Sequence, residues 1–315
     1  MLRLIGKRLA QAVPVLALVA VLAFCLMHLL PGDPAVVIAG QDASPAAIER
    51  IRTELGLDRP LPVQLLAWFG RIAQGDFGRS LVLNQSVLSA IGERLPVTLS
   101  IAAVALAVTL PVGIGLGVVA AYFRGSWADA AVMGVALLGV SVPGFWIGIL
   151  SVNVFSVKLG LVPSGGYAPL TSAGPGPWLL SLIQPAIVLA LFQIGYLARM
   201  TRGAMLDILD QDFIRTARAK GLGEWATIGK HAFRNTLIQV VTVTGIIFSL
   251  LVGGSVVIEQ VFALPGIGRL VVQGIIARDY PLIQGTMLLF GFAFVLINVV
   301  VDIAYTLVDP RVHYD

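Results

Sequence analysis

Long runs of apolar residues constrain this chain more than any other feature of its sequence. Of its 315 residues, 57% are hydrophobic and only 12% are charged, and the mean hydropathy is +0.92. Soluble globular domains carry roughly 25% charged residues, so the composition indicates a protein that folds in lipid. A helix needs about 20 apolar residues to cross the ~30 Å hydrocarbon core of a bilayer. Six runs meet that length: Leu9–Leu30, Pro96–Tyr122, Ala128–Val157, Leu182–Met200, Thr236–Ile258 and Gln284–Val308.

These runs predict an all-α, polytopic membrane protein with six transmembrane helices. The first run exceeds the apolar core of a typical signal peptide, and the sequence Pro-Gly-Asp-Pro at 31–34 follows it in place of a small-residue cleavage site. We therefore expect an uncleaved span. The third run is longer than a bilayer requires, so we expect it to tilt or to extend beyond the core. Pro143 and Gly144 are the positions at which it can break.

The distribution of Lys and Arg orients the spans, because cytoplasmic loops carry an excess of both. With a cytoplasmic N-terminus, the short outside loops contain only Lys158, Arg269 and Arg278. Segment 31–95 contains more cations, but segments of that length cross the membrane largely regardless of charge. Both termini are therefore predicted to be cytoplasmic. The inside segments then hold Arg3, Lys7, Arg8, Arg124, Arg199, Arg202, Arg215, Arg218, Lys220, Lys230, Arg234 and Arg311.

This topology divides the chain into four parts. Residues 1–30 form the N-terminal segment and first span, 31–95 an extracytoplasmic segment, 96–308 a five-helix core with a cytoplasmic loop at 201–235, and 309–315 a tail. The extracytoplasmic segment is predicted to be helical, with a helix starting at Ser44-Pro45 and a stop at Gly56. Its second helix is indicated by apolar residues at helical spacing, which are Leu65, Leu66, Phe69 and Ile72.

The cytoplasmic loop 201–235 is the most charged stretch of the chain. Acidic residues precede basic ones over 207–220, an order that complements the dipole of a short surface helix. Gly221 is placed to take a left-handed conformation and end that helix, and a second helical segment is expected to lead into span five. A basic loop can also serve only to anchor the topology. Anchoring the topology does not require a helix–glycine–helix hairpin of fixed length, whereas such a hairpin can serve as a binding surface for another protein.

Polar residues within spans are costly and therefore mark candidate pathways. Those in this chain are Asn153, Gln193, Asn298 and Asp302. Glu259, at the outer end of span five, is a further candidate for a pore mouth or gate, with a solvated helix end as the alternative interpretation. The glycines at 113, 115 and 117 are interpreted as sites of close helix packing.

Several classes of function have no support in the sequence. No Gly-x-Ser-x-Gly elbow or His-Glu-x-x-His zinc helix is present, and the three histidines are scattered, so neither an enzyme nor a metal site is predicted. The phosphate-binding pattern Gly-x4-Gly-Lys is also absent, because Met1 and Glu224 stand at the required first-glycine positions. The basic residues alternate with apolar runs, which argues against nucleic-acid binding. A secondary transporter or channel that uses no ATPase stays open as an alternative.

The loop resembles that of a known family. The sequence Arg-Thr-Ala-Arg-Ala-Lys-Gly at 215–221, followed by His-Ala-Phe-Arg-Asn at 231–235, is similar to the cytoplasmic loop of binding-protein-dependent ABC importer permeases, closest to the dipeptide, oligopeptide and nickel branch. The general family pattern is Glu-Ala-Ala, three residues, Gly, nine residues, then Ile-x-Leu-Pro. Gly221 and the spacing are kept here, and the other departures are typical of the peptide branch. Further similar segments lie at 29–34, 55–60, 75–80, 93–99, 258–269, 278–281 and 308–312.

The resemblance implies a permease subunit of the bacterial inner membrane that imports peptides or a similar solute, such as nickel or glutathione. It implies four kinds of partner: a second, similar permease, two ATPase subunits that carry the ATP and Mg, an external solute-binding protein, and membrane lipid. No cofactor is expected in this chain, and hydrolysis belongs to the ATPases. The loop would insert into a cleft of one ATPase, with the contact made by Arg215, Thr216, Ala217, Lys220, Gly221 and Leu222.

Overall fold

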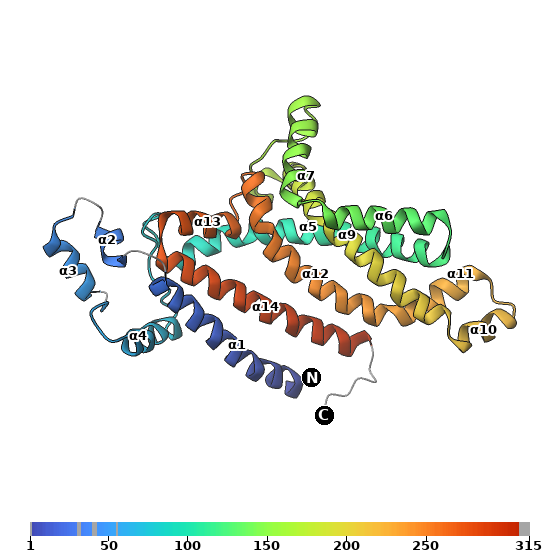
Figure 1. Ribbon diagram of the computed structural model, residues 1–315, viewed down its shortest axis with the longest axis horizontal. Helices are drawn as coiled ribbons and strands as arrows, with labels where there is room; N and C mark the ends of the chain where they lie inside the picture. The colour runs from blue at the N-terminus through green and yellow to red at the C-terminus, as the bar shows by residue number, and fades with distance from the viewer. Residues whose placement is uncertain (1, 30–32, 40–42, 55, 309–315) are drawn as a thin grey trace. The chain divides into compact units, whose positions relative to one another are not determined.

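The computed structural model describes the backbone of residues 2–29, 33–39, 43–54 and 56–308, and this part of the chain is almost entirely helical (Figure 1). The predicted all-α class is therefore confirmed. The tail at 309–315 lies outside the described residues. The helices are α1 (Leu2–Leu29), α2 (Pro34–Ala39), α3 (Pro45–Glu54), α4 (Leu61–Ala73), α5 (Val87–Tyr122), α6 (Trp127–Ser141), α7 (Gly144–Ser151), α8 (Leu170–Ala173), α9 (Pro175–Leu209), α10 (Asp212–Ala219), α11 (Glu224–Ala226), α12 (Phe233–Val261), α13 (Ile267–Ala277) and α14 (Tyr280–Val308), with π-helical segments η1 (Val152–Lys158) and η2 (Thr227–Ala232).

Four helical stretches of the described chain are long and apolar enough to cross a membrane. They correspond to predicted spans two, four, five and six, each extended by one or more turns beyond the apolar run. A bent helix pair provides a fifth candidate. The first predicted span lies in α1, where the shorter apolar stretch Ala10–Cys25 is described. The membrane-crossing stretches are Val87–Tyr122, Pro175–Leu209, Glu224–Val261 and Tyr280–Val301.

The predicted break in the third span is confirmed. The axis turns by 92° between Trp127–Gly139 and Gly144–Lys158, and α7 projects away from α6 (Figure 1). Val142 is extended, with φ −92° and ψ 129°. The cause is Pro143, because a proline disfavours the helical conformation of the residue before it and has no N–H to continue the helix.

The chain forms two compact units, which are described separately. In the first, made of residues 97–268 and 296–308, α9 packs against both α6 and α12. A small residue permits the packing of α9 on α6, because a Cβ at Gly195 would come within 2.6 Å of the Ala136 carbonyl oxygen. Gly117 of α5 likewise allows α5 to approach α9, because a Cβ there would come within 2.6 Å of Thr201 Cβ. The packing role predicted for the glycines of α5 is confirmed at Gly113 and Gly117, whereas Gly115 has nothing within 4 Å.

The second unit comprises residues 2–96 and 269–295, and its core joins α1, α4 and α14. Trp68 is buried against Phe24 of α1, with ring centroids 5.8 Å apart, and Leu288 of α14 completes the cluster. Three of the four apolar residues predicted for this helix, Leu65, Phe69 and Ile72, pack around the cluster. Leu66 does not: it is 72% exposed, because it lies on the opposite face of α4.

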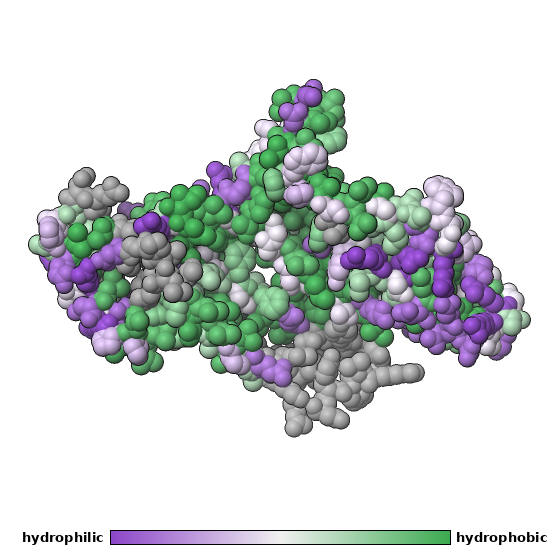
Figure 2. Space-filling view, viewed as in Figure 1, coloured by the Kyte–Doolittle hydropathy of each residue, from purple (hydrophilic) through white to green (hydrophobic). Residues whose placement is uncertain are grey.

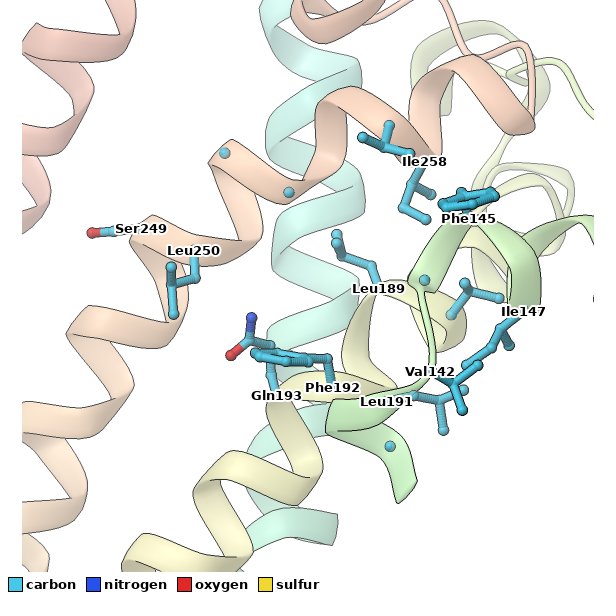
Figure 3. A pocket seen from close by; sticks show the side chains of 16 residues that line it. Val142, Phe145, Ile147, Leu189, Leu191, Phe192, Gln193, Ser249, Leu250 and Ile258 are labelled. Carbon is cyan, nitrogen blue, oxygen red and sulfur yellow. The ribbon is translucent and has the colours of Figure 1, made fainter. Parts of the chain in front are cut away.

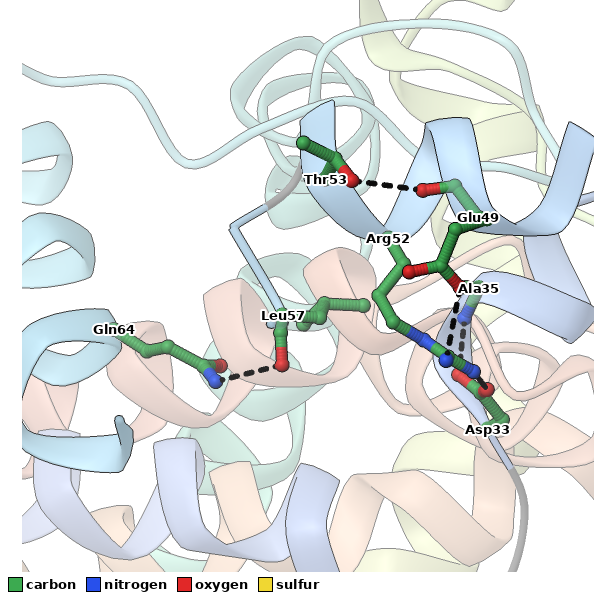
Figure 4. A network of polar contacts seen from close by, with 7 residues as sticks. All are labelled: Asp33, Ala35, Glu49, Arg52, Thr53, Leu57 and Gln64. Atoms are coloured by element: carbon green, nitrogen blue, oxygen red, sulfur yellow. Dashed lines mark hydrogen bonds and ion pairs between the residues drawn. The ribbon is translucent and has the colours of Figure 1, made fainter. Parts of the chain in front are cut away.

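Polar contacts fix the short helices between α1 and α5 (Figure 4). The Asp33 carboxylate accepts the N–H of Ala35 at the start of α2 and forms an ion pair with Arg52 of α3. Ser44 caps α3 as predicted, since its hydroxyl oxygen accepts the N–H of Ala47 at 3.3 Å. Gly56 follows the end of the helix with φ +66°, which is the predicted stop signal.

Candidate functional site

The charged loop between α9 and α12 folds as a helical hairpin. Its first arm, α10, ends in a Schellman motif in which the Gly221 N–H donates to the Arg218 carbonyl at 2.9 Å and the Leu222 N–H donates to the Ala217 carbonyl at 3.2 Å. Gly221 has φ +81°, the left-handed conformation expected from the sequence. Beyond the turn, the Arg218 guanidinium donates to both carboxylate oxygens of Glu224, at 2.9 and 3.2 Å. The turn and the ion pair fix the angle at which the second arm begins.

One side chain docks this hairpin onto the transmembrane helices. Ile214 is the only residue of α10 that is fully enclosed, with 0% of its surface exposed. It lies in a cluster with Ala121 at the end of α5, Met205 of α9, and Ile228 and Ala232 of η2. Ile214 therefore joins α10 to α5, to α9 and to the π-helical segment η2 at once. The sequence analysis did not select Ile214, although Ile214 and its neighbour Phe213 are the two large apolar residues of this charged helix.

The opposite side of α10 faces solvent, and hydrophilic side chains gather over α10 and α11 (Figure 2). Of the residues predicted to contact an ATPase, four are exposed, namely Arg215, Thr216, Lys220 and Gly221, while Ala217 and Leu222 are half-buried. Two exposed aromatic residues of the hairpin were missed, Phe213 at 44% and Trp225 at 90% exposure. An aromatic side chain within a charged loop was the available signal, because exposed aromatic residues commonly anchor interfaces.

Replacing Ile214 by alanine tests this docking. Loss of the buried methyl and methylene groups should weaken the attachment of α10 by about 2 kcal/mol. Backbone amides of α10 and η2 should then exchange hydrogen faster in the purified complex, by about 30-fold for that free energy. The change Lys230→Ala, at an exposed position of η2 outside the predicted ATPase contact, is the control and should leave exchange close to wild type. Equal protection in both variants would contradict a docking role for Ile214.

A second polar contact ties α6 to α9 close to the hairpin. Arg202 donates to both oxygens of Asp129, from Nε at 2.6 Å and from Nη2 at 2.7 Å, and the Asp129 side chain is largely buried. The same carboxylate accepts the N–H of Gly125 at 3.0 Å, which closes the turn before α6. This bidentate pair therefore fixes the start of α6 relative to α9. Its charged partners lie 73 positions apart, and the sequence offered no signal that would pair them.

Glu259 lies at the end of α12 and is fully buried. The Thr98 hydroxyl of α5 donates to Glu259 Oε1 at 2.6 Å and accepts the Ile267 N–H at 2.8 Å. Gly266 and Gly268 pack so closely over the carboxylate that neither position has room for a Cβ. The interpretation of Glu259 as a solvated helix end is wrong, because the turn after α12 folds back over it. A role for Glu259 at a pore mouth or gate stays a prediction.

A cavity of about 460 Å³ lies beside the break in the third span (Figure 3). Its wall combines the α6–α7 break with one face of α9 and one of α12, and it is largely apolar. Gln193 of α9 is the buried polar residue of this wall, and its amide points toward the side of α12 (Figure 3). Ser249 lines the same cavity and donates to the carbonyl of Gly245. Of the residues predicted to mark a pathway, the structure brings Gln193 to this cavity.

The other predicted pathway residues lie elsewhere. Asn153 is exposed on η1, and Asn298 is exposed on α14. Neither lines the cavity. The Asp302 side chain falls outside the described residues. These residues are therefore not gathered into one polar cluster, and their role in a pathway stays a prediction.

Comparisons with known proteins cover nearly the whole chain. Residues 113–314 match the family described as binding-protein-dependent transport system inner membrane component, and residues 1–102 match the N-terminal region of such membrane components. A protein of Brucella suis biovar 1 (strain 1330), provisionally named a peptide transport system permease, is 63% identical over 315 residues, which is all of both chains. The glutathione transport system permease GsiC of Salmonella choleraesuis (strain SC-B67) is 41% identical over 314 residues, 100% of each.

A solved structure agrees with this relationship at the level of the fold. A chain of the MetNI methionine ABC transporter in an inward-facing conformation superposes with a TM-score of 0.54 at 22% identity, covering 71% of this chain and 96% of that one. The resemblance first suggested by the loop at 215–235 is thus confirmed by family matches over most of the sequence. The chain belongs to the inner membrane components of binding-protein-dependent transport systems and is an ABC importer permease.

Proposed function

We propose that this permease moves peptides or another small solute, such as glutathione or nickel, across the bacterial inner membrane in a complex driven by ATP. It works beside a second permease subunit, a paralogue, above two ATPase subunits that bind ATP and Mg. An extracytoplasmic solute-binding protein delivers the solute. The names of the relatives in Brucella and Salmonella support the peptide class.

The proposed topology has six spans with both termini in the cytoplasm. The helical segment 31–95 then lies outside the membrane, where the binding protein docks, and α10 lies inside. The excess of Lys and Arg in the inside segments supports this orientation. The bent pair α6–α7 and helix α1 complete the six spans.

The observation that carries the proposal is the architecture of α10. On one face of α10, the buried residue Ile214 contacts three transmembrane elements. The other face carries exposed basic and aromatic side chains that another protein can bind. A helix with both faces can pass a movement of the bound protein to the transmembrane helices. ATP binding would close the ATPase pair, move α10, and switch the pore between inward and outward opening, as a rigid-body change biased by a ligand. Arg215, Thr216, Lys220 and Gly221 would then form the exposed part of the contact.

Purification from native membranes in mild detergent, followed by mass spectrometry, tests this proposal. A companion permease and an ATPase with a Gly-x4-Gly-Lys loop should purify with the chain. Vesicles that contain the complex should take up a peptide only with ATP and the binding protein present. A chain that remains alone in several detergents, and transports without ATP, would instead indicate a channel or secondary carrier. The loop 201–235 would then serve as a topology anchor.

A further inference from the structure

Helix α4 has two apolar faces, and the described part of the chain covers one of them. The covered face carries Trp68, which packs against Phe24 of α1 and shares a cluster with Leu288 of α14. The second face is an exposed stripe at helical spacing, made of Val63, Leu66, Ala67 and Gly70. Leu66 is 72% exposed and Val63 is 43% exposed. An uncovered apolar stripe marks a surface that meets a protein or a membrane.

The charges of α4 differ from those of its neighbour α3. Arg71 is the only charged residue among the 13 of α4. Helix α3 has 10 residues, and its charged ones are Glu49, Arg50, Arg52 and Glu54. The exposed positions of α3 include Glu49 and Arg50, as expected for a helix face in water. The exposed face of α4 lacks such charges, so its composition is that of a helix whose outer face lies in an apolar phase.

The packing of α4 identifies this phase as lipid. Leu288 lies eight residues after Tyr280, about 12 Å along the helix, within the apolar stretch Tyr280–Val301 of α14. Phe24 and Ala20, which belong to the same cluster, lie within the apolar stretch Ala10–Cys25 of α1. Helix α4 thus lies beside the C-terminal end of α1, against parts of two helices that are themselves apolar enough for the bilayer (Figure 1). Its uncovered face therefore borders the same lipid.

We propose that α4 is a membrane-surface helix that lies in the interface of the bilayer. Val63, Leu66 and Ala67 contact the acyl chains, at the depth of about 5–10 Å that is usual for such helices. The aliphatic part of Arg71 follows them, and its guanidinium reaches the phosphate groups of the lipids. This inference goes beyond the proposed function, because it holds for any solute and for either direction of transport. It places one helix of segment 31–95 on the bilayer and leaves α3 in water.

Fluorescence quenching tests the position of α4 in the full-length chain. The chain is purified with its partners and reconstituted into vesicles of phosphatidylethanolamine and phosphatidylglycerol. Cys25, which is exposed, is first replaced by serine. A nitrobenzoxadiazole label is then attached to Leu66→Cys or, in a second variant, to Ala67→Cys, a smaller change that keeps the test valid if the first variant folds poorly. A nitroxide near the lipid headgroup should quench both labels about twofold or more beyond one near the end of the acyl chain.

Arg50→Cys, at an exposed position of α3, is the control. Its label should be quenched by iodide in the buffer and not by either lipid nitroxide, whereas iodide should have little effect at positions 66 and 67. Iodide quenching at those two positions equal to that at position 50 would overturn the proposal, because the stripe would then be in water. Labels shielded from both iodide and the nitroxides would overturn it as well, because another protein chain would then cover α4.

Discussion

Gly221→Val should lower ATP-driven transport by about tenfold or more while the protein stays in the membrane. Gly221 has φ +81°, where a residue with a Cβ is strained by roughly 1–2 kcal/mol and a β-branched one by more. An added Cβ meets nothing within 4 Å, so the penalty comes from the backbone alone. Relieving it requires the turn to open, which breaks both hydrogen bonds of the Schellman motif and redirects the chain before Glu224. The transmembrane core is not touched.

The measurement compares uptake with the amount of protein in the membrane. Uptake should fall about tenfold or more, with the membrane level close to wild type. Gly223→Val is a matched control, because Gly223 lies two residues away, has φ −64°, and also has open space around it. It should transport normally. Normal transport by Gly221→Val would show that the turn geometry is not required for coupling.

Asp129→Ala should cause the largest loss of stability among the polar substitutions considered. Breaking a fully buried ion pair costs about 3–5 kcal/mol, because the remaining charge has no partner. Arg202 keeps 26% of its side chain exposed, so part of that cost is relieved by water and we expect about 2–3 kcal/mol. The Gly125 N–H also loses its acceptor. The start of α6 should then separate from α9.

Thermal unfolding of the purified complex, followed by tryptophan fluorescence, measures this effect. Asp210→Ala is the control: Asp210 pairs with Arg124 at 3.1 Å, but the two side chains are 66% and 57% exposed. Exposed pairs contribute about 0–1 kcal/mol, so this variant should unfold close to the wild-type midpoint. Equal midpoints for both variants would show that the Asp129–Arg202 pair does not hold α6 against α9.

Local features of the fold could be predicted from the sequence. Apolar runs of bilayer length identified four helical stretches and the bent pair, since hydrophobic length is a property of contiguous residues. Pro143 predicted the break, and Gly221 predicted the left-handed turn, because both act through the backbone of their own position. The motif at 215–235 indicated the family before any comparison.

The contacts of the candidate site residues could not be predicted from the sequence, because they join segments that lie far apart in the chain. In the sequence, Glu259 stands at the end of an apolar run and could be solvated. It is buried because Thr98 and the glycines at 266 and 268 pack against its carboxylate. Leu66 fitted the helical spacing and still faces away from the core, because its neighbour Trp68 determines which face of α4 is buried.

The sequence by itself determined that this chain folds in lipid, the positions of most of its helices and the turn in its charged loop at 201–235. Each of these depends on the hydrophobicity or the backbone freedom of neighbouring residues. Only the tertiary structure decided that Ile214 attaches α10 to three other elements, and that Gln193 shares a cavity with the uncapped start of α7. These pairings depend on how helices pack and rotate against one another, which is set by side-chain contacts across tens of residues.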